Sequence, residues 1–140
     1  MSSTENIVEK MIEQHRGLQA DLNIVADEVK EADPSGEKIE GALEKFSFEL
    51  KGHLSLENEV FYVELLKKMN SEGKDTTDTE SFIAEMGKIG EQVMAFLNKY
   101  NKASVISDGI ADFKDQFSAI VEALNMRIES EESGVYLYWK

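Results

Sequence analysis

Cysteine is absent from this sequence of 140 residues, which excludes disulfides, thiolate metal ligands and cysteine nucleophiles. Histidine is nearly absent too, since it occurs only at His15 and His53. No uninterrupted apolar run approaches the ~18 residues that cross a bilayer, and residues 1–10 lack the basic-then-apolar form of a signal peptide. We therefore expect a cytoplasmic protein.

Positive charge is also scarce, because 15 lysines and arginines face 28 aspartates and glutamates, for a net charge of −13. Such a chain repels phosphate backbones and anionic lipids, so we expect neither nucleic acid nor a membrane as a partner. A protein partner is not indicated. The length favours a single domain over residues 1–140.

Proline occurs once, as Pro34, in a run of turn-forming residues from Asp33 to Gly36. On both sides of this turn, apolar residues recur at steps of three and four, which is the period of a helix face. We expect Asp78 or Thr79 to cap the third helix, and residues 101–107 to form the last connection. The four predicted helices cover residues 4–30, 39–69, 82–100 and 110–135. The sequence thus predicts an all-α fold, an antiparallel up-down-up-down four-helix bundle.

The second apolar stripe is interrupted by His53 and Glu57, which are four residues apart and share a helix face. This spacing alone is commonest in exposed pairs. Here Val60 and Phe61 continue the stripe beyond the pair, so both side chains are expected in the core. An unpaired buried charge is costly, so a partner or a metal ion is expected nearby.

A weak internal repeat links the second and fourth helices. Residues 53–57 are followed by Tyr62, and residues 127–131 are followed by Tyr136 at the same offset, with Arg127 in the place of histidine. The repeat places Glu131 opposite Glu57 in a bundle core, where carboxylates and imidazoles form metal sites. We expect both tyrosines to pack at the ends of the bundle with hydrated hydroxyl groups.

Residues 13–16, 53–62 and 127–132 resemble those of bacterial hemerythrin-like (HHE cation-binding) domains, and the resemblance covers nearly the whole chain. Such domains are four-helix bundles that typically hold two irons, bridged by two carboxylates and otherwise bound by five histidines. They bind oxygen, sense redox state or handle iron. By position, the resemblance implies that His15 and His53 bind one iron, that Glu57 bridges, and that Glu131 or Glu132 supplies the second carboxylate.

The other half of that ligand set is missing. The family's remaining histidines correspond to Met86, Gly90 and Arg127, so this chain cannot assemble the full di-iron set. We predict one metal ion, bound by His15, His53, Glu57 and Glu131. Two nitrogen and two oxygen ligands suit iron, zinc or manganese, and the resemblance favours iron.

The sequence leaves the function open between alternatives. The first is a non-catalytic sensor or binding role, because no nucleophile lies beside a base. The second is a metal-free interaction or regulatory domain in which Arg127 neutralises the core carboxylates, although its long stem could also carry the guanidinium to solvent. The third is an oxygen-activating enzyme with one iron, for which no substrate pocket is indicated. Glu129 and Glu132 are expected on a solvated face.

Overall fold

The computed structural model describes residues 6–139, and all regular structure in this range is helical, so the predicted all-α class is confirmed. No helix in this range has the length and apolar character needed to cross a membrane. The predicted start of the first helix, at Thr4, lies outside the described residues. The elements are α1 (Ile7–Val29), α2 (Gly36–Leu56), the π-helical η1 (Glu57–Phe61), α3 (Tyr62–Ser71), α4 (Thr77–Lys99), α5 (Ala103–Asp108), α6 (Ile110–Ser133) and the 3₁₀-helical η2 (Val135–Trp139).

The predicted turn around Pro34 separates α1 from α2, and two side chains fix its geometry. Ser35 caps α2, because its hydroxyl accepts a hydrogen bond from the Lys38 N–H at 3.3 Å. The Glu28 carboxylate in turn accepts one from the Ser35 N–H at 2.8 Å. From this cap, α2, η1 and α3 follow one another without a break to Ser71, as the predicted long second helix requires.

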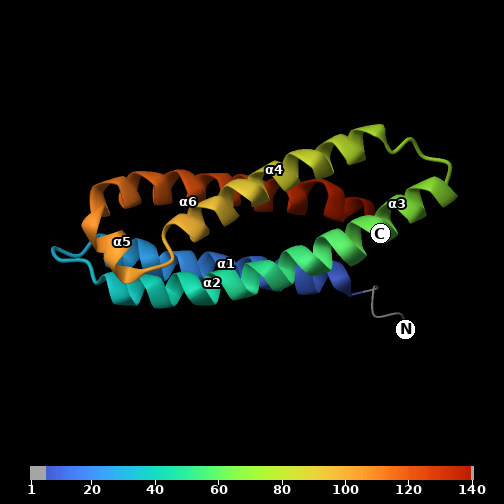
Figure 1. Ribbon diagram of the computed structural model, residues 1–140. Coiled ribbons are helices and arrows are strands. Elements are labelled where there is room, and N and C mark those ends of the chain that lie inside the picture. Colours follow the sequence, from blue (N-terminus) through green and yellow to red (C-terminus); the bar gives the residue numbers. More distant parts are fainter. Residues whose placement is uncertain (1–5, 140) are drawn as a thin grey trace.

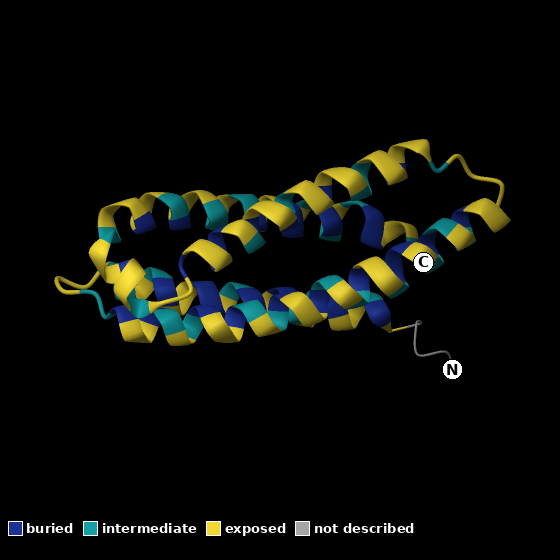
Figure 2. Ribbon diagram, in the orientation of Figure 1, coloured by how far each residue is buried: buried dark blue, intermediate teal, exposed yellow. Residues whose placement is uncertain are grey.

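The long helices lie in two layers (Figure 1), with α1 and α2 side by side below α4 and α6. Within these layers α1 contacts α2, and α4 contacts α6. Between them, α1 contacts α6 and α2 contacts α4, so the helices enclose a shared interior. Buried residues line the inward faces (Figure 2).

The start of α4 differs from the prediction, since its N-cap is Thr76 rather than Asp78 or Thr79. The reason is local. Asp75 accepts a hydrogen bond from the Thr77 N–H at 3.0 Å, so a free helical N–H group is already satisfied at this earlier residue.

The last connection also differs from the prediction, because residues 103–108 form the short helix α5. A helical turn here buries Ile106 completely, and Glu40 accepts a hydrogen bond from the Ala103 N–H at 3.2 Å. The predicted fourth helix stops early, at Ser133, and Val135 lies in η2. At the break, a side chain on Gly134 would place Cβ 2.5 Å from the Ser130 carbonyl oxygen, so only glycine fits there.

The apolar core has two parts with a polar layer between them. One cluster includes Leu18 of α1 and Leu50 of α2, and the other includes Met11 of α1 and Phe61 of η1. His15 lies between Met11 and Leu18 in the sequence, and its side chain is 1 % exposed. The polar layer is therefore enclosed by apolar packing on both sides, and that layer is the candidate site.

Candidate metal centre

The four residues predicted as metal ligands meet in this polar layer. His15 comes from α1, His53 from α2, Glu57 from the first position of η1 and Glu131 from α6. Each offers a donor atom within 4.8 Å of the others, and none is more than 2 % exposed. Residues that are far apart in the sequence thus form one compact group of two imidazoles and two carboxylates.

The backbone widens where Glu57 enters the site. Five residues, Glu57–Phe61, adopt a π-helix, and the N–H of Tyr62 donates to the carbonyl of Glu57, five residues earlier. Such insertions in α-helices are rare and often occur at functional sites. The prediction of a continuous helix did not include this widening.

The two imidazoles face each other through their Nε2 atoms, which are 3.1 Å apart. The Nδ1 atoms point outward: His15 Nδ1 lies 2.7 Å from a Glu132 carboxylate oxygen, and His53 Nδ1 lies 2.7 Å from the Gln14 amide oxygen. An Nδ1–H that donates to such an oxygen fixes the ring and leaves Nε2 to serve the centre. Gln14 and Glu132 thus orient the two imidazoles.

These contacts separate the roles of the two adjacent glutamates in α6. Glu131 is fully buried in the centre, whereas Glu132 lies outside it, bonded to His15 Nδ1 and to Arg16. The expectation that Glu132 belongs to a solvated face is therefore wrong. Its carboxylate is only 23 % exposed and bridges α6 to α1, whereas Glu129 is exposed as expected.

Arg127 fills the other half of the layer. Its side chain is 4 % exposed, so the guanidinium does not reach solvent. Nη2 donates to Glu57 Oε1 at 2.5 Å, and Nη1 donates to the carbonyl oxygen of Met86 at 2.8 Å. A Cβ on Gly90 would lie 2.9 Å from Nη1, so glycine leaves the space that the guanidinium occupies.

Each carboxylate spans both halves of the layer. Glu57 presents Oε1 to Arg127 and Oε2 toward His53 Nε2, at 3.7 Å. Glu131 presents Oε2 to Arg127 Nε at 3.5 Å and Oε1 to His15 Nε2 at 3.4 Å. Glu131 Oε1 is buried and accepts no hydrogen bond within residues 6–139. A buried acceptor without a donor is costly, and a cation on the imidazole side would satisfy it.

Two tyrosines complete the layer, so the expectation that their hydroxyl groups are hydrated at the bundle ends is wrong. Tyr62 and Tyr136 are each 3 % exposed. Each tyrosine bonds to the glutamate of the other repeat, since Tyr62 donates to Glu131 at 2.6 Å and Tyr136 donates to Glu57 at 2.5 Å. The internal repeat held the signal for this arrangement, because each tyrosine follows its own glutamate by five residues.

Burial and the neighbouring charges shift the pKa values of the cluster. Burial lowers the pKa of His53 to about 4. Burial also lowers the pKa of His15, but the neighbouring carboxylates of Glu131 and Glu132 outweigh it and raise that pKa above the ordinary value. A metal ion bound by both Nε2 atoms must displace any proton that either nitrogen carries.

The carboxylates are shifted in opposite directions. Burial, followed by repulsion from Glu131, raises the pKa of Glu57 to about 7. Burial favours a higher pKa for Glu131, but His15, Glu57 and Arg127 outweigh it and lower that pKa. Burial raises the pKa of both site tyrosines, so the phenols act as donors. Perturbed groups that converge in this way are typical of functional sites.

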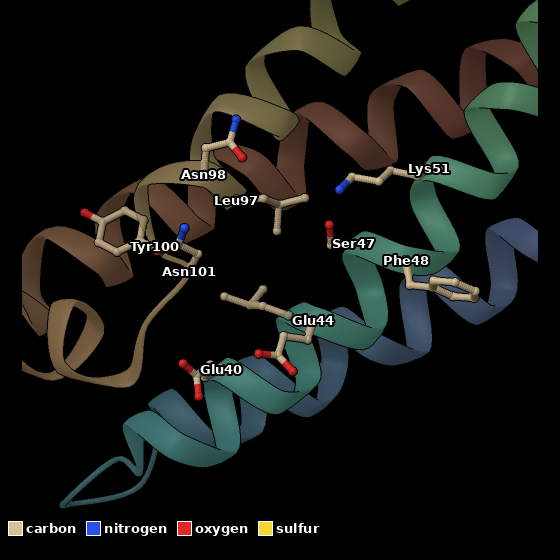
Figure 3. Close-up of a pocket in the computed structure, with 10 residues that line it drawn as sticks. Glu40, Glu44, Ser47, Phe48, Lys51, Leu97, Asn98, Tyr100 and Asn101 are labelled. Atoms are coloured by element: carbon tan, nitrogen blue, oxygen red, sulfur yellow. The ribbon is translucent and has the colours of Figure 1, made fainter.

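Of two surface grooves, one adjoins the polar layer. His53 and Gln14 line a groove of about 850 Å³ between α1 and α2, so the imidazole side lies next to open space. A second groove, of about 350 Å³, lies between α2 and the end of α4 (Figure 3). Its lining includes Glu40, Glu44 and Lys51 but no imidazole, so it offers no comparable ligand set.

The donor atoms on the imidazole side have the chemistry of a metal site. Two imidazole nitrogens and two carboxylate oxygens converge there, and one of the oxygens lacks a hydrogen bond. Comparison with curated proteins gave no match, and comparison with solved structures gave none either. The model of the hemerythrin HHE cation binding domain, however, matches residues 6–138. The chain therefore belongs to the hemerythrin HHE cation binding domain family.

Proposed function

We propose that this chain binds a single metal ion through His15, His53, Glu57 and Glu131 and has a non-catalytic role as a sensor or binding domain. The observation that carries the proposal is the position of Arg127. Its guanidinium takes the half of the layer in which a second ion would otherwise lie, and Met86 and Glu57 hold it there.

Charge supports one ion rather than two. Buried charge must be compensated locally, and the layer holds two carboxylates against one guanidinium. One divalent ion and Arg127 together bring three positive charges against two carboxylates, for a net charge of +1. Two divalent ions beside Arg127 would raise the net charge to +3, and no third carboxylate among the described residues lies within the layer to balance it.

Iron is the proposed ion, with zinc or manganese as alternatives. The family typically binds iron, and a set of two nitrogen and two oxygen ligands is acceptable to all three metals. The ion would be held by the two Nε2 atoms and by the carboxylate oxygens that face them. Gln14 and Glu132 support this role, since each fixes an imidazole through Nδ1.

A second candidate function is a metal-free interaction or regulatory domain. The observation in its favour is the same guanidinium, which already pairs with Glu57 and lies 3.5 Å from Glu131. A metal-free layer still leaves Glu131 Oε1 without a donor, and we therefore rank this function second.

The proposal includes an architecture and a setting. We propose one domain over residues 1–140 and an antiparallel up-down-up-down bundle, supported by the family match and by the contacts among α1, α2, α4 and α6. The net charge of −13 argues against nucleic acid and membranes as partners. A cytoplasmic location stays a prediction that is based on the absence of cysteine.

The direct test is metal stoichiometry combined with thermal stability. We expect one iron(II) or zinc(II) per chain and, at a free concentration of 100 times Kd, ~2.7 kcal/mol of stabilisation. His53→Ala should abolish both effects, whereas Glu44→Gln, on the exposed side of α2, should leave them unchanged. Two ions per chain would contradict the single-ion site. No bound ion and no rise in Tm would favour the metal-free domain.

A further inference from the structure

Tyr136 reaches the imidazole side of the layer, although it is not one of the four proposed ligands. Its hydroxyl lies 2.5 Å from Glu57 Oε2 and 3.2 Å from His15 Nε2. Both of these atoms are proposed metal donors. The Tyr136 hydroxyl, although outside the four-residue set, thus contacts proposed donor atoms of two different ligands.

The spacing of 3.2 Å between the Tyr136 oxygen and His15 Nε2 is that of neighbouring ligands around one ion. Donors that bind a common ion at ~2.1 Å and at right angles lie ~3 Å apart. The two Nε2 atoms are 3.1 Å apart, and the Tyr136 oxygen is 3.2 Å from the nearer one. The phenol oxygen thus extends the ring of donors by one more position.

The local fold directs Tyr136 into the layer. The helix α6 ends at Ser133, and after Gly134 the chain continues into η2. Gly134 is required there because of its close approach to Ser130. The Tyr136 ring then stacks on His15, with centroids 5.6 Å apart, and meets Phe61 edge-on at 5.2 Å. The hydroxyl is consequently held in place on two sides by packing.

Tyr62, its counterpart in the internal repeat, lies on the other side. Its hydroxyl donates to Glu131 Oε2, the oxygen that faces Arg127. The described contacts of Tyr62 include no imidazole. The two tyrosines are equally buried, and they therefore form a matched pair in which only Tyr136 adjoins the metal-binding half.

We propose that Tyr136 is a further ligand of the metal and binds iron(III) through its phenol oxygen. This inference rests on the proposed metal site. In the step, the phenol O–H bond breaks, an iron–oxygen bond forms and the proton passes to solvent, without any change of oxidation state. Iron(III) is the suitable state, because its higher charge displaces a phenol proton better than a divalent ion does.

The test uses the full chain loaded with iron(III), added as its citrate complex, with bound iron measured in each sample. We expect a phenolate-to-iron charge-transfer band in the visible, with phenolate ring modes enhanced in the resonance Raman spectrum. Tyr136→Phe should lose the band, whereas Tyr62→Phe should keep it. Circular dichroism checks that both variants remain folded.

Each outcome decides the inference. A wild type that holds iron without the band, a band that survives in Tyr136→Phe, or a band lost in Tyr62→Phe overturns it. If Tyr136→Phe does not fold, the Raman spectra of the wild type and of Tyr62→Phe still decide. A chain that takes up no iron(III) also overturns it, and a parallel zinc(II) titration then shows whether the four-residue site itself has failed.

Discussion

Replacing Arg127 by methionine removes the guanidinium that lies between the two core carboxylates. Methionine keeps much of the apolar volume but donates no hydrogen bond. The substitution leaves Glu57 Oε1 and the Met86 carbonyl without their donors at 2.5 and 2.8 Å. Since Arg127 is 3 % exposed, water does not replace those donors freely.

The expected loss follows from this burial. Breaking a buried ion pair by removing one partner costs ~3–5 kcal/mol. For a chain of 140 residues, this corresponds to a fall in Tm of roughly 10–20 °C. Arg16→Met is the matched control, because Arg16 pairs with Glu132 at the surface and is 53 % exposed. Exposed pairs contribute ~0–1 kcal/mol, so that variant should differ little from the wild type.

The loss should also depend on pH. The pKa of Glu57 is about 7 in the folded chain, above its ordinary value of 4.5. The stability that this raised pKa contributes is therefore present below pH 4.5 and is lost as the pH rises through 7. Arg127 lowers the pKa of Glu57, so its removal raises that pKa further, and at higher pH the variant must either bury an uncompensated carboxylate or take up a proton that the wild type does not need. The destabilisation should be larger at pH 8 than at pH 6.

Urea unfolding followed by circular dichroism, with a chelator present, measures the free energy of unfolding at both pH values. Similar m-values for the variants make the comparison valid. If Arg127→Met matches Arg16→Met at pH 8, the guanidinium does not hold the carboxylates together. That result would remove the basis for a single-ion site.

Three further predictions concern the same layer. Gly90→Ala should destabilise the chain by ~1–2 kcal/mol, because the added methyl group displaces the Arg127 guanidinium. Gly87→Ala is the control and should stabilise α4 by up to ~1 kcal/mol, because open space surrounds Gly87. Equal effects of the two substitutions in urea unfolding would argue against the contact between Gly90 and Arg127. Gln14→Leu and Glu132→Leu should each weaken metal binding about 10–100-fold in calorimetric titrations, and unchanged affinity would exclude an orienting role. Burial and a nearby carboxylate raise the pKa of Glu57 to about 7, so a metal ion must compete with a proton for this carboxylate at pH 6. Metal affinity should therefore increase about tenfold or more from pH 6 to pH 8. An affinity that does not change with pH would contradict proton displacement.

Helical periodicity made the elements and the central polar residues predictable. His53 and Glu57 share a face because they are four residues apart, and the flanking apolar residues showed that this face is buried. Glu131 followed from the internal repeat. The structure places these residues within one layer with His15, which the family resemblance had indicated.

Other features depend on contacts that no local pattern encodes. Gln14 and Glu132 each bond to a histidine on another helix, and nothing in their sequence neighbourhood distinguishes them from surface residues. The π-helix at Glu57 is likewise a tertiary outcome, since its residues also suit an α-helix. The positions of Tyr62 and Tyr136 are different, because the internal repeat encodes them: each tyrosine follows a core glutamate by five residues.

Arg127 and Gly90 are linked by space as well as by charge. A Cβ at position 90 would lie 2.9 Å from Nη1, so a larger side chain there competes with the guanidinium for one volume. Histidine at position 90, which the family resemblance would require for a second iron, is therefore incompatible with Arg127 in its present place. The half of the layer that lacks histidines is thus occupied, and its occupant already bonds to Glu57, the carboxylate that would otherwise bridge two ions. Restoring a two-iron site would therefore require changes at Met86, Gly90 and Arg127 together, because a change at Gly90 alone leaves a clash and a change at Arg127 alone leaves a carboxylate without its partner.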